Sequence, residues 1–258
     1  MKILITSFFT LVVTLGFAQE ASEKKFSFDG SIDAYYRTNL TAPNDDNQIA
    51  PSTSFAETAG FSLGMANIIA NYEKGKIGAV ADLVFGPRGE AASSTIINQM
   101  YAYYNISENT TLTFGKFNTF WGNGHSSLII SNNIPSYPQA GFSWKISNSL
   151  TLEYLLGSLS SKIVDSSSSD LYDNVGSRNT FFSRSIAAHR FIWEPFPFLT
   201  FNAMETVIYG DRTIDVHYLL PFIPFWSMQH YTGDIDNIQM CGEVIFHLKQ
   251  NWDIYGSL

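Results

Sequence analysis

The segment FSFDGSIDAYYR, from Phe26 to Arg37, alternates between two kinds of side chain. In an extended strand, successive side chains point to opposite faces. The apolar side chains therefore share one face: Phe26, Phe28, Ile32, Ala34 and Tyr36. The polar side chains share the other: Ser27, Asp29, Ser31, Asp33 and Arg37. This pattern predicts a β-strand that separates an apolar environment from a polar one.

The same period of two recurs along the chain. It is clear in 60–66, 76–85, 111–114, 140–146, 150–156, 240–248 and 252–258, and less regular in 96–106, 183–193 and 199–209. Together with the first segment, these make roughly eleven candidate strands, each of about the length that crosses a bilayer. After residue 19, no stretch approaches the ~20 consecutive apolar residues of a membrane helix.

The connections between these segments alternate in length. Short polar turns follow residues 104, 146, 193 and 248, whereas long polar connections run through 38–54, 86–95 and 158–179. The last of these contains four consecutive serines, for which a flexible loop is expected. Short turns at one end and long loops at the other are typical of outer-membrane barrels. The sequence therefore predicts an all-β fold, an antiparallel transmembrane β-barrel with roughly 10–12 strands present.

Composition favours this fold over a secreted β-sandwich. The chain of 258 residues is 45% hydrophobic and 15% aromatic, but only 15% charged. Soluble domains carry about 25% charged residues, and the outward strands of a sandwich should be richer in Lys and Glu. The net charge of −8 makes nucleic acid an improbable partner. The single cysteine, Cys241, cannot form an intramolecular disulfide.

Residues 1–19 have the pattern of a cleaved signal peptide. Lys2 precedes the uncharged run ILITSFFTLVVTLGF, and a polar stretch follows Gln19. Residues 20–258 would then form the barrel in the outer membrane. The expected partners are outer-membrane lipid and the barrel-assembly machinery.

No sequence motif indicates an enzyme or a cofactor. The chain lacks a Gly-x-Ser-x-Gly elbow, a His-Glu-x-x-His helix, a phosphate-binding glycine loop and a Cys-x-x-Cys pair. Hydrolysis of a sugar needs two carboxyl groups, which Asp234 and Asp236, with Glu205 elsewhere in the chain, could supply. Roles in a turn or facing solvent are favoured for the two aspartates. The five histidines lack the spacing of a zinc site. We therefore expect no catalysis, no metal and no cofactor.

Two regions offer candidate ligand-binding residues. In WGNGHSS, Trp121 and His125 could stack on and hydrogen-bond to a sugar, although Trp121 could equally belong to an interfacial aromatic girdle. Glu205 shares a strand face with Ala203 and Val207, where a carboxylate would be costly toward lipid. We therefore expect Glu205 to face the lumen beside an arginine, Arg184, Arg190 or Arg212, as part of a charge network or a ligand site. The candidate polysaccharide-binding set is Trp121, His125, Arg190, Glu205, Arg212, Asp236 and Asn237.

Residues 26–117 resemble the OmpL-like β-barrel porins of Bacteroidetes. The resemblance is carried by SFDGSIDAYYRTNL, NYEKGKIGAVADLVFGPRGE and INQMYAYYNISENTTLTFGKF. Residues 117–258 resemble the capsule-assembly Wzi family, through GKFNTFWGNGHSSLIISNNIPSYP, HRFIWEP, METVIYGDR and YLLPFIPFWSMQHYTGDIDN. Both resemblances imply an outer-membrane barrel of a Gram-negative bacterium.

The Wzi resemblance implies a non-enzymatic barrel in capsule or exopolysaccharide assembly or attachment, with surface polysaccharide as partner. The alternatives are a porin-like diffusion channel and an accessory barrel for gliding motility or surface proteins. Wzi-like barrels are longer than this chain, and the two resemblances meet abruptly near Phe117. This predicts either a truncated or chimeric reading frame or a natural short barrel.

Overall fold

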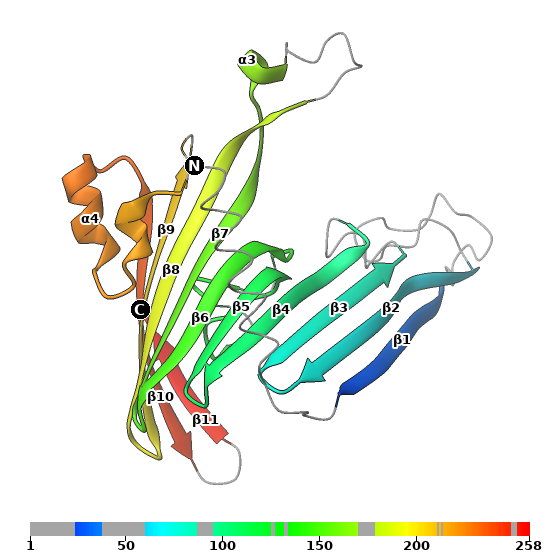
Figure 1. Ribbon diagram of the computed structural model, residues 1–258, viewed down its shortest axis with the longest axis horizontal. Coiled ribbons are helices and arrows are strands. Elements are labelled where there is room, and N and C mark those ends of the chain that lie inside the picture. Colours follow the sequence, from blue (N-terminus) through cyan, green and yellow to red (C-terminus); the bar gives the residue numbers. More distant parts are fainter. Residues whose placement is uncertain are drawn as a thin grey trace.

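The computed structural model describes residues 24–37, 60–86, 95–124, 127–131, 134–169, 179–210, 212, 214–248 and 252–258. These residues form a single antiparallel sheet of eleven strands, each paired with its neighbours in chain order (Figure 1). The strands are β1 (Lys25–Arg37), β2 (Gly60–Lys74), β3 (Ile77–Phe85), β4 (Ile97–Ser107), β5 (Thr110–Phe117), β6 (Tyr137–Ser147), β7 (Leu150–Val164), β8 (Phe181–Phe196), β9 (Leu199–Gly210), β10 (Asn237–Leu248) and β11 (Trp252–Ser257). Each of the eleven predicted segments lies on one of them, which confirms the all-β prediction.

Two strands extend furthest beyond the segments that the side-chain pattern predicts. β2 continues past Ala66 to Lys74, and β7 continues past Leu156 to Val164. In both extensions, backbone pairing with a neighbouring strand maintains the extended conformation. The ladder of main-chain hydrogen bonds, rather than the period of the side chains, therefore sets these strand ends.

In the described parts of the connections there are three short helical segments: α3 (Ser166–Ser169), η3 (Val216–Leu219) and α4 (Phe225–Thr232). The serine run, expected to be a flexible loop, forms α3, where the Asp165 carboxylate accepts hydrogen bonds from the amide and hydroxyl of Ser167. Within the described part of the chain, no helix has the length and apolarity to cross a membrane. The predicted signal peptide lies outside the described residues.

Connection lengths alternate as predicted. Two residues separate β2 from β3, β4 from β5, β6 from β7 and β8 from β9, whereas the intervening connections are long. Because consecutive strands are antiparallel, all short turns lie at one end of the sheet and all long connections at the other. The β5–β6 and β9–β10 connections fold back onto the sheet and position the sites described below.

Strand register gives the sheet one apolar face. Adjacent strands place their apolar residues side by side, as in the row Phe114, Ala140, Leu156, Ala187, Val207 and Ile238. We call this side the apolar face. Several of its large side chains are exposed, with Phe61 at 87%, Ile32 at 77% and Phe114 at 74%. Since burying such a side chain away from water is worth about 1.5–3 kcal/mol, this face suits a non-aqueous environment.

The opposite side is the polar face. One of its rows contains Ser143, Glu153 and Arg190, and another contains Asn202, Glu243 and Ser257. On β1, Ser27, Asp29 and Ser31 point to this side, whereas Phe26, Phe28 and Ile32 belong to the apolar face. Polar and apolar residues therefore separate along β1 and in these rows, while the polar face also carries apolar residues such as Leu155, Ala188 and Met204.

The two edges of the sheet are not joined in the described structure. β1 and β11 are the outer strands, and neither pairs with the other. An odd number of consecutive antiparallel strands makes β1 and β11 run in the same direction. They cannot form the antiparallel pair that would close an even-numbered bacterial barrel. The closure predicted from the sequence is thus absent among the described strands.

Candidate functional site in the polar face

The β5–β6 connection folds onto the polar face of the sheet. Its described parts are residues 118–124, 127–131 and 134–136. The Trp121 amide donates to the Ile130 carbonyl, which joins the two arms of the connection. Trp121 and Ile130 are 3% and 1% exposed, in a cluster with Leu155, Ala188 and Met204 of the polar face. The connection is therefore packed against the sheet, in contrast to a solvated loop.

Polar contacts fix this connection at three strands. The Thr119 hydroxyl donates to Gln139 on β6 at 3.1 Å. The guanidinium of Arg190 on β8 lies 5.3 Å from the centre of the Trp121 ring, a cation–π distance. The Asn123 amide donates to the Glu243 carboxylate on β10 at 3.3 Å. The connection thus crosses the polar face from β6 to β10.

Two carboxylates with different partners lie beneath it. Glu153 accepts two hydrogen bonds from Arg190, at 2.6 and 3.1 Å, and forms an ion pair. Glu243, which is only 3% exposed, accepts from Asn202 at 2.7 Å and from Ser257 at 3.1 Å. Both of these donors are neutral groups. Neither carboxylate was selected from the sequence, where Glu243 shares its strand face with Cys241 and Ile245.

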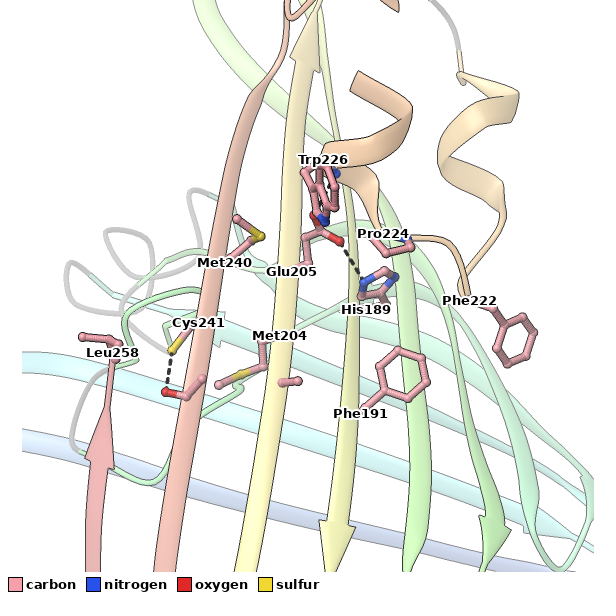
Figure 2. Close-up of a pocket in the computed structure, with 12 residues that line it drawn as sticks. His189, Phe191, Met204, Glu205, Phe222, Pro224, Trp226, Met240, Cys241 and Leu258 are labelled. Atoms are coloured by element: carbon pink, nitrogen blue, oxygen red, sulfur yellow. Dashed lines mark hydrogen bonds and ion pairs between the residues drawn. The ribbon is translucent and has the colours of Figure 1, made fainter. Parts of the chain in front are cut away.

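On the apolar face, Glu205 holds the start of α4 (Figure 2). Its two carboxylate oxygens accept hydrogen bonds from the Phe225 amide at 2.7 Å and the Trp226 amide at 2.8 Å. Pro224, the residue before the helix, supplies no capping side chain. Glu205 therefore satisfies amides that a helix leaves unpaired and places a negative charge at the positive end of the helix dipole.

His189 also contacts this carboxylate, with its Nε2 3.1 Å from Oε2 of Glu205. The two residues are directly opposite in the β8–β9 register, and both are 5% exposed. The arginine predicted beside Glu205 is wrong, because Glu205 lies on the apolar face and its side-chain partner is His189. Arg190 contacts Glu153, and Arg212 contacts Asp215 and Asp236. The β9–β10 connection covers the Glu205 carboxylate and supplies hydrogen-bond donors to it, which offsets the cost of burying its charge. The alternation of side chains along a strand cannot reveal this cover.

An apolar cavity of about 580 Å³ lies next to Glu205 and His189 (Figure 2). It lies between α4 and the apolar face, and its lining includes Phe191, Ala203, Phe222, Trp226 and Met240. The Phe222 ring also packs against Trp144 on β6, with ring centres 6.2 Å apart. The β9–β10 connection therefore extends over the apolar face, on the side of the sheet opposite the β5–β6 connection.

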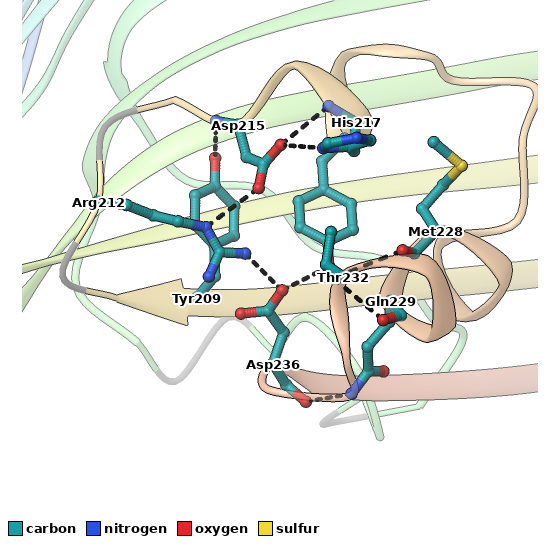
Figure 3. A network of polar contacts seen from close by, with 9 residues as sticks. Tyr209, Arg212, Asp215, His217, Met228, Gln229, Thr232 and Asp236 are labelled. Atoms are coloured by element: carbon teal, nitrogen blue, oxygen red, sulfur yellow. Dashed lines mark hydrogen bonds and ion pairs between the residues drawn. The ribbon is translucent and has the colours of Figure 1, made fainter.

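A charge network fixes the two ends of the β9–β10 connection (Figure 3). Arg212 forms ion pairs with Asp215 and Asp236, and the Tyr218 hydroxyl donates to Asp236. Burial, together with the hydrogen bond to Asp236, raises the pKa of Tyr218. Burial also acts to raise the pKa of Asp215, but the His217 amide and ring and the Arg212 charge outweigh it, so the pKa lies below its usual value.

The candidate polysaccharide-binding residues lie in separate places. Trp121 and Arg190 meet on the polar face, Glu205 is on the apolar face, and Arg212 and Asp236 pair in the β9–β10 connection. Asn237 is the exposed first residue of β10. His125 lies outside the described residues. In the part of the chain that the structure describes, no three His, Cys, Asp or Glu residues are grouped to hold a metal ion. Polysaccharide binding stays a prediction for this set.

Comparison with known families supports the first of the two resemblances. The model of the OmpL-like family "putative beta-barrel porin-2" matches residues 25–125. This part of the chain resembles a porin. The region covers β1 to β5 and the start of the β5–β6 connection. The match supports an outer-membrane, porin-like barrel; the Wzi resemblance, a role in capsule assembly and a Bacteroidetes origin receive no such support.

Comparison with solved structures and with curated proteins does not identify a relative of this chain. A NanC porin structure is 11% identical, with a TM-score of 0.37, over 75% of this chain and 79% of that chain. A TM-score below 0.5 does not establish a shared fold. No curated protein matches the sequence significantly.

Proposed function

We propose that this protein is a porin-like barrel of the outer membrane, which lets small solutes diffuse through a lumen lined by the polar face. The strand register carries the proposal, because it separates an exposed apolar face from a polar face over eleven described strands. In hydrocarbon, only a sheet whose backbone groups are bonded within protein is stable, and its outward side chains must be apolar. The lumen therefore requires that further protein pairs with the open edges of β1 and β11. The porin-family match over residues 25–125 supports the same function.

The β5–β6 connection gives the proposed channel a narrowing element. It lies on the polar face, held by Gln139, Arg190 and Glu243. Solutes would therefore pass a lumen that this segment partly fills. The function is passive and requires no catalytic residue.

Two measurements test this function. Membrane fractionation and heat-modifiable gel mobility should place the folded protein in the outer membrane, whereas recovery in the soluble periplasm would overturn the location. Purified protein reconstituted in planar bilayers should give steady conductance steps. An electrically silent, fully folded protein would contradict the channel and favour an anchoring role.

A further inference from the structure

We infer that the polar face selects for cations, so that the proposed channel passes cationic solutes more readily than anionic ones of the same size. The inference rests on the proposed function and adds the class of solute. It depends on which charged side chains lie on the polar face and which of them are neutralised by ion pairs. It also depends on how a narrow lumen strengthens the electric field of the charges that are not neutralised.

Acidic side chains outnumber basic ones on the polar face. Among the described side chains at register-paired positions, seven carboxylates lie on this face: Asp29, Asp33, Glu73, Asp82, Glu153, Glu243 and Asp253. Four basic side chains lie there: Lys25, Lys145, Arg184 and Arg190. Carboxylates are ordinarily ionised at neutral pH, so this face carries excess negative charge.

The most enclosed cation on this face is already neutralised. The Arg190 guanidinium lies 2.6 Å from the Glu153 carboxylate, and the Trp121 ring covers it. At such a distance an ion pair largely cancels its own field for a passing solute. Arg190 therefore offers little attraction to an anion.

Two buried carboxylates accept hydrogen bonds from neutral groups. Glu243 is held by Asn202, Ser257 and the Asn123 amide. Asp82, which is 5% exposed, accepts from Asn98 through one oxygen, while its other oxygen, Oδ1, has no hydrogen-bond partner among the described residues.

Asn202 adds a second unsatisfied acceptor. Within the described part of the chain, its Oδ1 has no hydrogen-bond partner, although the residue is only 7% exposed. Unsatisfied buried oxygens of this kind attract donors or cations, because a buried acceptor that is left unpaired is unfavourable. The free acceptors on the polar face therefore favour positive ligands, independently of the charge count.

The geometry of the proposed lumen strengthens the effect. A channel with low-dielectric walls focuses the field of its lining charges and enriches counter-ions inside it. Glu243 binds the β5–β6 connection directly, so its charge lies where the lumen is narrowed. Mobile salt screens such fields within about 8 Å at physiological ionic strength, so the preference should weaken at high salt.

The reversal potential of the full-length protein in planar bilayers under a KCl gradient tests the inference. We expect a potential of the sign that potassium permeation gives, smaller when both solutions are made more concentrated at a constant ratio. Steady conductance with a reversal potential of zero, or of the chloride sign, would overturn the cation preference and leave the channel intact. Absence of conductance in folded protein would overturn the channel itself, and the preference with it.

Paired substitutions identify the source of the preference. Glu243→Gln removes one charge from the polar face but keeps an amide that can bond to Asn202, whose free Oδ1 can accept after a side-chain flip. We expect the K⁺/Cl⁻ permeability ratio to fall by about two-fold, from the loss of one unit charge near the solute path. The matched control, Glu205→Gln, removes the same charge from the neighbouring strand on the apolar face and should leave the ratio unchanged. Equal effects of the two substitutions would contradict selection by the polar face.

Discussion

Glu205 lies where an ionised group is most costly, on the apolar face of the sheet. Its carboxylate is stable there because His189 and two helix amides satisfy both oxygens. In Glu205→Ala, these three groups would lose their partner while remaining buried. We expect the free energy of unfolding to fall by about 3–5 kcal/mol, as for breaking one side of a buried pair. Urea unfolding in detergent, followed by heat-modifiable mobility, measures the change.

Glu205→Gln serves as the control for this substitution. Its amide oxygen can still accept from one helix amide, so the loss of stability should be smaller. Glu108→Ala, in the short turn between β4 and β5, removes a carboxylate without a helix contact and should change stability by less than about 0.5 kcal/mol. If Glu205→Ala were as mild as Glu108→Ala, the role of Glu205 as the anchor of α4 would be wrong.

Asp215 makes the stability of the β9–β10 connection depend on pH. The contacts with Arg212 and His217 hold the pKa of Asp215 below its ordinary value. A carboxyl whose folded pKa is depressed contributes fully above its unfolded pKa of about 3.9 and loses that contribution as the pH falls through the folded value. Hydrogen exchange of residues 214–236 should therefore accelerate below about pH 4. In Asp215→Asn, exchange should already be fast at neutral pH and vary less on acidification.

At the scale of single elements, the β5–β6 connection should limit the conductance. Trp121→Ala removes the buried ring that packs on Arg190 and the polar face, so the connection should detach from the sheet. We expect larger or noisier single-channel conductance. Trp144→Ala removes a half-exposed tryptophan from the apolar face and is the matched control. Unchanged conductance in folded Trp121→Ala would show that the connection does not narrow the path.

The sequence predicts strands better than it predicts connections. All eleven strands follow from a period of two, because that period reports which face each side chain occupies. The extensions of β2 and β7 depend on pairing with neighbours, which local pattern does not encode. The packing of Trp121 and the cover over Glu205 arise from long-range contacts of two connections. The same period correctly placed Glu205 beside Ala203 and Val207, but the rule that charges face the lumen then gave the wrong partner.

For the whole molecule, the decisive question is which medium covers the apolar face. Phe114 on β5 belongs to this face and is 74% exposed, whereas its neighbour Thr113 points to the polar face, opposite Gly141 on β6. In a soluble protein, replacing an exposed phenylalanine by arginine is nearly neutral or favourable. In a bilayer, an arginine facing lipid costs about 2–4 kcal/mol near the midplane.

Phe114→Arg should therefore reduce the yield of folded, heat-modifiable protein in the outer membrane, and lower its stability by about 2–4 kcal/mol in lipid vesicles. Thr113→Arg, the same side chain one position away, should fold and remain in the membrane, because it enters the polar face. It should also reduce the K⁺/Cl⁻ permeability ratio, since it adds a positive charge to the lumen. Equal tolerance of arginine at both positions would show that water covers the apolar face, and the membrane location would then be wrong.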